Sequence, residues 1–282
     1  MFKDDLLAGK RFVITGGGSG IGRNMARRFM ELGAKVAICG RREEVLAETS
    51  EALAKETGGE IAYRPCDIRD PEQVEAFLDW LWSEGAPDGL VNNAAGNFIA
   101  RSEELSHRAY DAVVKIVLNG TAYMTLGCGK RWLAEEHKAS VLSIVTSYAW
   151  TGSAYVLPSA MAKSGVLAMT RSLAVEWGRR GIRLNAIAPG PFPTKGAWDR
   201  LVPLPKLAEG LESRVPLGRP GDHQELADLA VYLMADGSAY VNGEVVTIDG
   251  GEWLNGAGQF NFIGDLMTEE DWAAIRPKKK GQ

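Results

Sequence analysis

The 282-residue chain has few of the residues that build metal sites or disulfide frameworks. It contains three cysteines and three histidines, and no two cysteines stand in CxxC spacing. A structural zinc site needs four such ligands, and a disulfide-stabilised domain needs more cysteines than this. We therefore expect reduced thiols, no bound metal and a cytoplasmic protein.

Long hydrophobic runs are also absent. No stretch approaches the roughly 18 apolar residues of a membrane-spanning helix, and residues 1–5, MFKDD, have no apolar signal core. The net charge of −4 argues against nucleic acid as the main partner. The basic run at 278–280 is interpreted as a solvated tail. The sequence predicts neither a membrane nor a nucleic-acid partner.

Short apolar runs alternate along the chain with longer segments of helical periodicity. Seven runs have the length and composition of buried strands: 12–14, 36–38, 61–63, 89–91, 141–145, 182–187 and 245–248. Helical patterns between them include 43–55, 72–82 and 159–177. This order is typical of a parallel sheet covered by helices on both faces. We predict one α/β domain, residues 1–282, with a doubly wound, Rossmann-type, seven-stranded parallel sheet.

Seven prolines fall between residues 189 and 220. Proline at this density interrupts regular structure, and long loops in compact domains are often lids or binding loops. We interpret 189–220 as a substrate lid, with a surface insertion that has no role as the alternative. The residues after 251 form a C-terminal extension beyond the last predicted strand.

A glycine-rich turn, TGGGSGIG at 15–22, lies between the first predicted strand and the first predicted helix. Glycines let such a turn approach a pyrophosphate, and the N–H groups and dipole of the helix start bind it. A purely structural turn is the alternative. The predicted cofactor contacts here are Thr15, Gly16, Gly18, Ser19, Gly20, Ile21 and Gly22.

The residues after the second predicted strand indicate which nicotinamide cofactor binds. NAD-dependent enzymes usually carry an acidic residue near this point for the ribose 2′-hydroxyl. This chain has Arg41 and Arg42, whose guanidinium groups suit a 2′-phosphate. We therefore predict NADP(H). Asp67 and Ile68, after the third predicted strand, are expected at the adenine ring, with a turn or capping role as the alternative for Asp67.

Several motifs together resemble the short-chain dehydrogenase/reductase family: TGGGSGIG at 15–22, NNAAG at 92–96, Lys163, PGP at 189–191 and DGG at 249–251. The resemblance runs from about residue 10 to residue 251. It implies cofactor contacts by Asn93, Ala94, Lys163, Pro189, Gly190 and Phe192. It also implies a homotetramer formed through helices near 106–130 and 159–178, although burial within one subunit explains the same apolar residues.

Two departures separate the chain from ordinary members of that family. Ser159 stands four residues before Lys163, where the family has its tyrosine, and Val117 replaces the structural asparagine. Instead, Tyr148 lies fifteen residues before the lysine and Asn97 follows NNAAG. This arrangement resembles the 2,4-dienoyl-CoA reductases, especially the mitochondrial type. It implies the catalytic set Tyr148, Asn97, Lys163 and Ser159, and acyl-CoA contacts by Arg69, Phe98, Ser106 and Arg200.

The chemistry of a 2,4-dienoyl thioester explains why a phenol and an amide suit it. Hydride addition at the far diene carbon moves negative charge to the thioester oxygen and forms a dienolate. Two hydrogen-bond donors stabilise that oxygen, each by roughly 3 kcal/mol, and our candidates are Tyr148 and Asn97. We expect Lys163 to bind the nicotinamide ribose and to make the nearby phenol more acidic. The predicted product is a 3-enoyl-CoA of unsaturated fatty acid degradation.

Each assignment has a structural alternative. Tyr148 and Phe98 can pack in the core, Asn97 can cap a loop, and Ser106 can cap a helix. For the whole protein, one alternative is an ordinary carbonyl, 3-ketoacyl-CoA or hydroxyacyl-CoA oxidoreductase that tolerates Ser159. A second is an NADP-binding protein without catalytic activity.

Overall fold

The computed structural model describes residues 2–194, 196, 201, 210, 213–261 and 263–275. Seven strands form one sheet in the order β3-β2-β1-β4-β5-β6-β7, and every neighbouring pair is parallel. The strands are β1 Arg11–Thr15, β2 Lys35–Gly40, β3 Ile61–Pro65, β4 Gly89–Asn92, β5 Ala139–Ile144, β6 Ile182–Pro189 and β7 Val245–Ile248. The predicted Rossmann-type sheet is confirmed. Its order reverses between β1 and β4, where open α/β sheets bind ligands.

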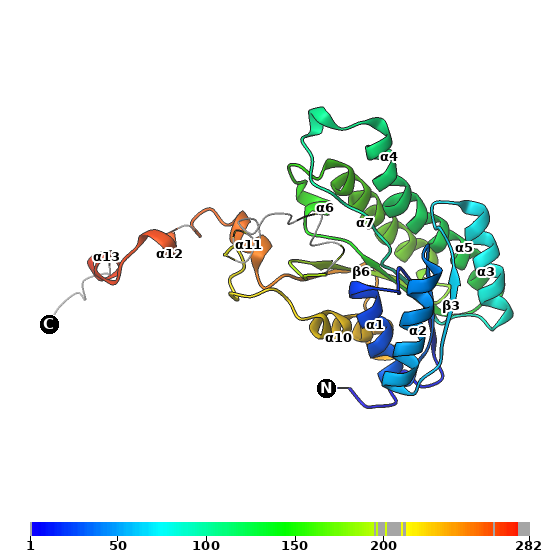
Figure 1. Cartoon of the computed structure of the whole chain (residues 1–282). Helices are drawn as coiled ribbons and strands as arrows, with labels where there is room; N and C mark the ends of the chain where they lie inside the picture. Colours follow the sequence, from blue (N-terminus) through cyan, green and yellow to red (C-terminus); the bar gives the residue numbers. More distant parts are fainter. Residues whose placement is uncertain are drawn as a thin grey trace.

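Helices cover both faces of the sheet (Figure 1). One face packs against α1 Gly20–Glu31, α2 Glu43–Thr57 and α10 His223–Met234. The other packs against α3 Pro71–Ser83, α5 Gly120–Ala134 and α7 Leu157–Gly178. Side chains alternate along a strand, so neighbouring residues pack on opposite faces of the sheet. Phe12 and Ile14 pack on the face covered by α1, α2 and α10, and Val13 packs on the other face.

The segment predicted as one long helix near 106–130 is divided. It consists of α4 His107–Val114, a π-helical turn at Lys115–Asn119, and α5. Val117, which replaces the family's asparagine, lies in this π turn and is buried with Val113 and Ala162. A structural asparagine at this position would need polar partners, whereas valine fills an apolar cluster. The helix prediction was therefore incomplete here, since apolar spacing does not report a π turn.

Helix α10 was not predicted, although its start carries a recognisable signal. Asp222 and Glu225 form a capping box: the Asp222 side chain accepts from the N–H of Gln224 (2.8 Å), and Glu225 accepts from the N–H of Asp222 (2.8 Å). Such a box ahead of apolar residues at helical spacing marks a helix N-terminus. Leu226, Ala230 and neighbours then bury their side chains against α1 and the sheet.

Much of the predicted lid at 189–220, including Arg200, lies outside the described residues. The C-terminal extension contains α11 Glu252–Ala257, α12 Ile263–Leu266 and α13 Glu269–Ile275, which lead away from the sheet (Figure 1). None of the described helices is long and apolar enough to cross a membrane. The three cysteines are buried and form no disulfide.

The close contact between α5 and α7, on one face of the sheet, leads to a prediction about stability. A Cβ on Gly129 of α5 would lie 2.3 Å from the ring of Trp177, which is buried on α7. Gly129→Ala should therefore lower the free energy of unfolding by about 1–3 kcal/mol, the usual cost of overpacking a core. Urea denaturation measures this change. The control is Gly237→Ala, where a Cβ meets nothing within 4 Å; equal stability of the two variants would contradict the packing argument.

Candidate active site

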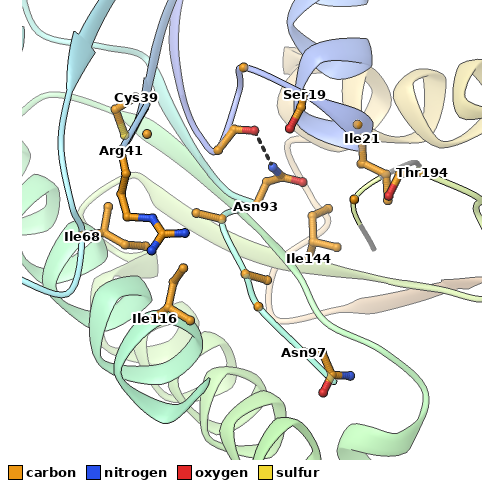
Figure 2. Close-up of a pocket in the computed structure, with 18 of the residues that line it drawn as sticks. Ser19, Ile21, Cys39, Arg41, Ile68, Asn93, Asn97, Ile116, Ile144 and Thr194 are labelled. Carbon is orange, nitrogen blue, oxygen red and sulfur yellow. Dashed lines mark hydrogen bonds between the residues drawn. The ribbon is translucent and has the colours of Figure 1, made fainter. Parts of the chain in front are cut away.

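A cavity of about 470 Å³ opens at the carboxyl end of the sheet, beside the switch between β1 and β4 (Figure 2). Segments that follow β1, β2, β3, β4, β5 and β6 all contribute to its lining. Figure 2 shows Ser19 and Thr194 on one side, Arg41 on another and Asn97 at one end. The cavity brings together most of the predicted site: Gly16, Gly18, Ser19, Gly20, Ile21, Arg41, Arg42, Asp67, Ile68, Asn93, Ala94, Asn97, Tyr148, Ser159 and Lys163.

The glycine-rich turn has the backbone that its sequence predicts. Gly16 and Gly20 have φ of +67° and +56°, a region that side chains rarely adopt. A Cβ on Gly22 would lie 2.5 Å from the Gly16 oxygen and 2.4 Å from the Asn93 amide nitrogen. Ser19 stands at the N-cap of α1 without capping it through its side chain. The turn therefore presents backbone N–H groups and a hydroxyl at a helix start, as anion binding requires.

Thr15 and Asn93 hold this turn against the loop after β4. The Thr15 hydroxyl accepts from the N–H groups of Asn93 and Ala94, each at 3.0 Å. The Asn93 side-chain nitrogen donates in turn to the backbone oxygens of Thr15 (3.0 Å) and Gly16 (3.3 Å). Figure 2 draws the contact with Gly16. Thr15 is buried and does not face the cavity. Its hydrogen bonds with Asn93 hold together the two loops that form this side of the cavity.

Arg41 and Arg42 lie on the exposed rim of the cavity, and Figure 2 shows the Arg41 guanidinium over it. Among the described residues neither arginine forms a salt bridge or a side-chain hydrogen bond. Asp67 differs, because Arg69 donates to it through Nε (2.9 and 3.0 Å). Hydrogen bonding by Arg69 lowers the pKa of the Asp67 carboxyl. The rim therefore offers two guanidinium groups that form no salt bridge among the described residues, and one carboxylate, Asp67, that is bonded to Arg69 and also interacts with the charge of Arg41.

Three predicted catalytic side chains form one hydrogen-bonded chain. The Asn97 amide nitrogen lies 3.2 Å from the Tyr148 hydroxyl oxygen, which is 3.1 Å from the Ser159 hydroxyl. Ser159 is only 2% exposed. The N–H of Phe98 donates to the Asn97 side-chain oxygen at 2.9 Å, which identifies the nitrogen as the end facing the phenol. Two donors, an amide and a phenol, thus converge at one end of the cavity.

Tyr148 lies beyond the end of β5, which stops at Ile144, and begins the one-turn helix α6 Tyr148–Thr151. One expectation about it was wrong, because its phenol is not made more acidic by Lys163. Burial raises the pKa of Tyr148, while hydrogen bonds from Ser159 and Thr146 act in the opposite direction. The phenol is therefore protonated at neutral pH and remains a hydrogen-bond donor.

Lys163 reaches the same part of the cavity from α7, one turn beyond Ser159. Its ammonium donates to the backbone oxygen of Ile144, the last residue of β5. Burial lowers the pKa of Lys163 to about 8, because the charged form loses hydration. The lysine is thus a cation near neutral pH, held at the strand end and facing the cavity.

Several predicted contact residues do not line the cavity: Thr15, Gly22, Arg69, Phe98, Ser106, Pro189, Gly190 and Phe192. The ring of Phe192 is buried in the layer beneath α10, and Phe98 packs against the cluster of Val113, Val117 and Ala162. Ser106 accepts from the N–H of Ala109 and caps α4. Their contacts with cofactor or substrate stay predictions.

Sequence reasoning missed lining residues beyond β6, namely Thr194, Gly196 and Leu201. Thr194 lies close to the glycine turn, since a Cβ on Gly20 would stand 3.2 Å from its methyl carbon. A polar residue shortly after the PGP motif was the available signal. The loop after β6 therefore meets the glycine-rich turn across the cavity.

Comparison with known proteins identifies relatives of this chain. A family model described as enoyl-(acyl carrier protein) reductase matches residues 16–252. The probable 2,4-dienoyl-CoA reductase 3 of Caenorhabditis elegans, named as (3E)-enoyl-CoA-producing, is 43% identical and covers 100% of this chain and 93% of its own. A probable 2,4-dienoyl-CoA reductase of Bacillus subtilis, named as (2E)-enoyl-CoA-producing, is 42% identical over 87% of this chain and 97% of its own.

Solved structures give the same family. A short-chain dehydrogenase from Bacillus anthracis has a TM-score of 0.79 and 43% identity, covering 86% of this chain and 96% of that chain. A putative 2-deoxy-D-gluconate 3-dehydrogenase from Agrobacterium tumefaciens, solved with bound NADP, has a TM-score of 0.82 and 29% identity over 90% and 100%. The chain therefore belongs to the short-chain dehydrogenase/reductase family of nicotinamide-dependent oxidoreductases, and within that family it is similar to proteins named 2,4-dienoyl-CoA reductases.

Proposed function

We propose that the protein reduces 2,4-dienoyl-CoA thioesters to 3-enoyl-CoA with NADPH, a step in unsaturated fatty acid degradation. The observation that carries this proposal is the hydrogen-bonded chain of Asn97, Tyr148 and Ser159 beside Lys163. Ketone reduction by this family uses a tyrosine four residues before the lysine. Here that position is a buried serine, and the phenol enters from another element together with an amide.

The lining of the cavity supports a dinucleotide with a 2′-phosphate as the cofactor. The glycine turn and the start of α1 suit the pyrophosphate, and Lys163 suits the hydroxyls of the nicotinamide ribose. Arg41 and Arg42 suit the 2′-phosphate, because both guanidinium groups lie at the exposed rim and neither forms a salt bridge among the described residues. When bound, the nicotinamide supplies a hydride.

In this reaction negative charge develops on the thioester oxygen, which we place beside the hydrogen-bond donors of the site. Hydride joins carbon 5 of the dienoyl group, the double bonds shift, and the electron pair reaches the thioester oxygen. The Tyr148 hydroxyl and the Asn97 amide donate to that oxygen, and each contributes about 3 kcal/mol to transition-state stabilisation. A proton that originates in solvent is then delivered by the Tyr148 hydroxyl, directly or through a water, to carbon 2, and the double bond is left between carbons 3 and 4. Ser159 keeps the phenol oriented during these steps.

The remaining predicted residues complete the proposal for an acyl-CoA. Arg69 and Arg200 are assigned to the CoA phosphates, Ser106 to the pantetheine and Phe98 to the dienoyl slot. The names of the C. elegans and B. subtilis relatives support this substrate class. We further propose a cytoplasmic homotetramer with a lid at 189–220.

Isotope labelling tests the reaction at the level of single bonds. With NADPH deuterated at the transferred position, the product should carry deuterium at carbon 5. With unlabelled NADPH in D₂O, deuterium should enter at carbon 2. Both positions are read by NMR of the product. Deuterium from solvent at carbon 4 identifies a 2-enoyl product, and failure to consume NADPH with any dienoyl-CoA contradicts the proposed reaction.

The two arginines at the rim predict cofactor preference. Arg41→Ala should weaken NADPH binding at least tenfold and leave NADH binding nearly unchanged, because only NADPH carries the phosphate that the guanidinium binds. Fluorescence titration with each cofactor gives the two dissociation constants. Arg101→Ala, at an exposed arginine that does not line the cavity, is the matched control. An equal loss for both cofactors in Arg41→Ala would contradict the assignment.

The buried lysine predicts a pH dependence of cofactor binding. The cation binds the ribose, and its pKa is about 8 in the free protein. NADPH affinity should therefore be full below pH 8 and should fall as the pH rises through that value, when the ammonium loses its proton. Titration calorimetry across this range measures the slope. Lys163→Met should bind weakly with no slope in this interval, and an unchanged slope would assign it to another group.

A further inference from the structure

The helix that carries Tyr148 is too short to position its own residues. Helix α6 has one turn, Tyr148–Thr151, and helices of this length have no stability alone. Ser147 at its N-cap gives no side-chain hydrogen bond, and Gly152, with φ of +72°, follows its last residue. The place of the phenol therefore depends on what α6 contacts in the rest of the fold.

Besides the hydrogen bonds of the Tyr148 hydroxyl itself, two side-chain contacts from neighbouring elements hold α6. The Ser164 hydroxyl of α7 donates to the backbone oxygen of Ala149 at 2.6 Å. On another element, the ring of Trp253 meets the ring of Trp150 edge to face, with centroids 5.6 Å apart and planes at 79°. This is a preferred geometry for an aromatic pair. Trp253 belongs to α11, so the contact joins the start of the C-terminal extension to the helix of the phenol.

Trp253 is itself fixed to the sheet. Asp249, directly after β7, accepts from the N–H of Gly251 (2.9 Å) and from the N–H of Trp253 (2.8 Å). Asp249 is packed against the end of β6, since a Cβ on Gly190 would lie 2.7 Å from the Asp249 Cβ. Asp249 therefore links the backbone of Trp253 to the ends of β6 and β7. The Trp253 ring packs on Trp150 of α6 from this fixed position.

We propose that Trp253 is a positioning residue for catalysis. Its ring holds α6, and thereby keeps the Tyr148 hydroxyl within hydrogen-bond reach of Asn97. Neither Trp253 nor Trp150 lines the cavity, so the effect is transmitted through α6 and not through contact with substrate. This inference rests on the proposed function, because it uses the phenol as the group that acts on the thioester.

Steady-state kinetics with a dienoyl-CoA tests this role. Trp253→Ala should lower kcat about tenfold without changing the KM for NADPH, since small misplacements of a catalytic group are costly. Trp253→Phe keeps an aromatic ring and should stay within about twofold of the parent protein. Leu254→Ala is the control, because Leu254 lies on the same helix and is 65% exposed. Parent-like kcat in Trp253→Ala would overturn the proposal.

A double mutant separates positioning from general damage. If Trp253 acts through the phenol, adding Trp253→Ala to Tyr148→Phe should cause no further loss of kcat. A second tenfold loss in the double mutant would overturn the proposal, because Trp253 would then act on something other than Tyr148.

A spectroscopic readout needs no turnover. In protein labelled with 3-fluorotyrosine, the ¹⁹F resonance of Tyr148 is identified by its loss in Tyr148→Phe. It should shift or broaden in Trp253→Ala and stay in place in Leu254→Ala. An unmoved resonance in Trp253→Ala overturns the inference. Absence of dienoyl-CoA turnover in the parent protein instead contradicts the proposed function, and the spectrum still decides the role of Trp253.

Discussion

Tyr148→Phe should lower kcat for dienoyl-CoA reduction by about 10²-fold, the usual effect of removing one oxyanion donor. The substitution deletes the hydroxyl that contacts Asn97 and Ser159 and leaves the ring in place. Because burial raises the pKa of this phenol, the parent protein presents a neutral donor throughout the physiological pH range. Stopped-flow single-turnover rates measure the effect on the chemical step.

The matched control for this prediction is Tyr155→Phe. Tyr155 lies close in sequence, is 60% exposed and does not line the cavity. It should retain the parent rate, and Tyr148→Phe should retain the parent affinity for NADPH. A Tyr148→Phe protein within threefold of the parent rate would show that the phenol does not stabilise the dienolate.

Asn97→Asp should cause an even larger loss, beyond 10²-fold. The aspartate keeps an oxygen for the N–H of Phe98, so the loop contact at 2.9 Å can persist. It removes the amide donor and places a carboxylate where the dienolate oxygen must gather charge. Repulsion is then added to the lost hydrogen bond. The single-turnover rate at neutral pH measures the combined effect.

The pH dependence of Asn97→Asp separates these two contributions. As the pH falls, the new carboxyl gains a proton and regains an O–H donor, so the rate of this variant should rise relative to the parent. Asn97→Ala has no such group and should show the smaller loss, about 10²-fold, with the parent's pH profile. An Asn97→Asp protein faster than Asn97→Ala at neutral pH would contradict an oxyanion at this position.

The layers of the fold follow from local patterns. Buried strands leave continuous apolar runs, and the glycines of 15–22 mark a turn that only small residues fit. The π turn at 115–119 could not be predicted, because KIVLN has ordinary helical spacing. Helix α6 could not be predicted either, because a single helical turn is too short to show a hydrophobic period. Its partner Trp253 is far away in sequence.

The site required information that periodicity does not carry. Asn97 and Tyr148 meet only after β4 and β5 pair in parallel and place both carboxyl ends together. The family resemblance predicted that Asn97 and Tyr148 belong to one site. Composition and spacing alone left both residues with structural alternatives. The ring of Phe192 is buried in the core layer that contains α10, and the cofactor contact that its motif implies stays a prediction.

The most direct test of the central claim is NADPH consumption with one conjugated substrate and one ketone. Purified protein should oxidise NADPH with 2,4-hexadienoyl-CoA and should do so far faster than with a 3-ketoacyl-CoA of equal length. The rate with the dienoyl-CoA should depend on Tyr148 and Asn97. Turnover of the 3-ketoacyl-CoA without turnover of dienoyl-CoAs of several chain lengths would contradict the account.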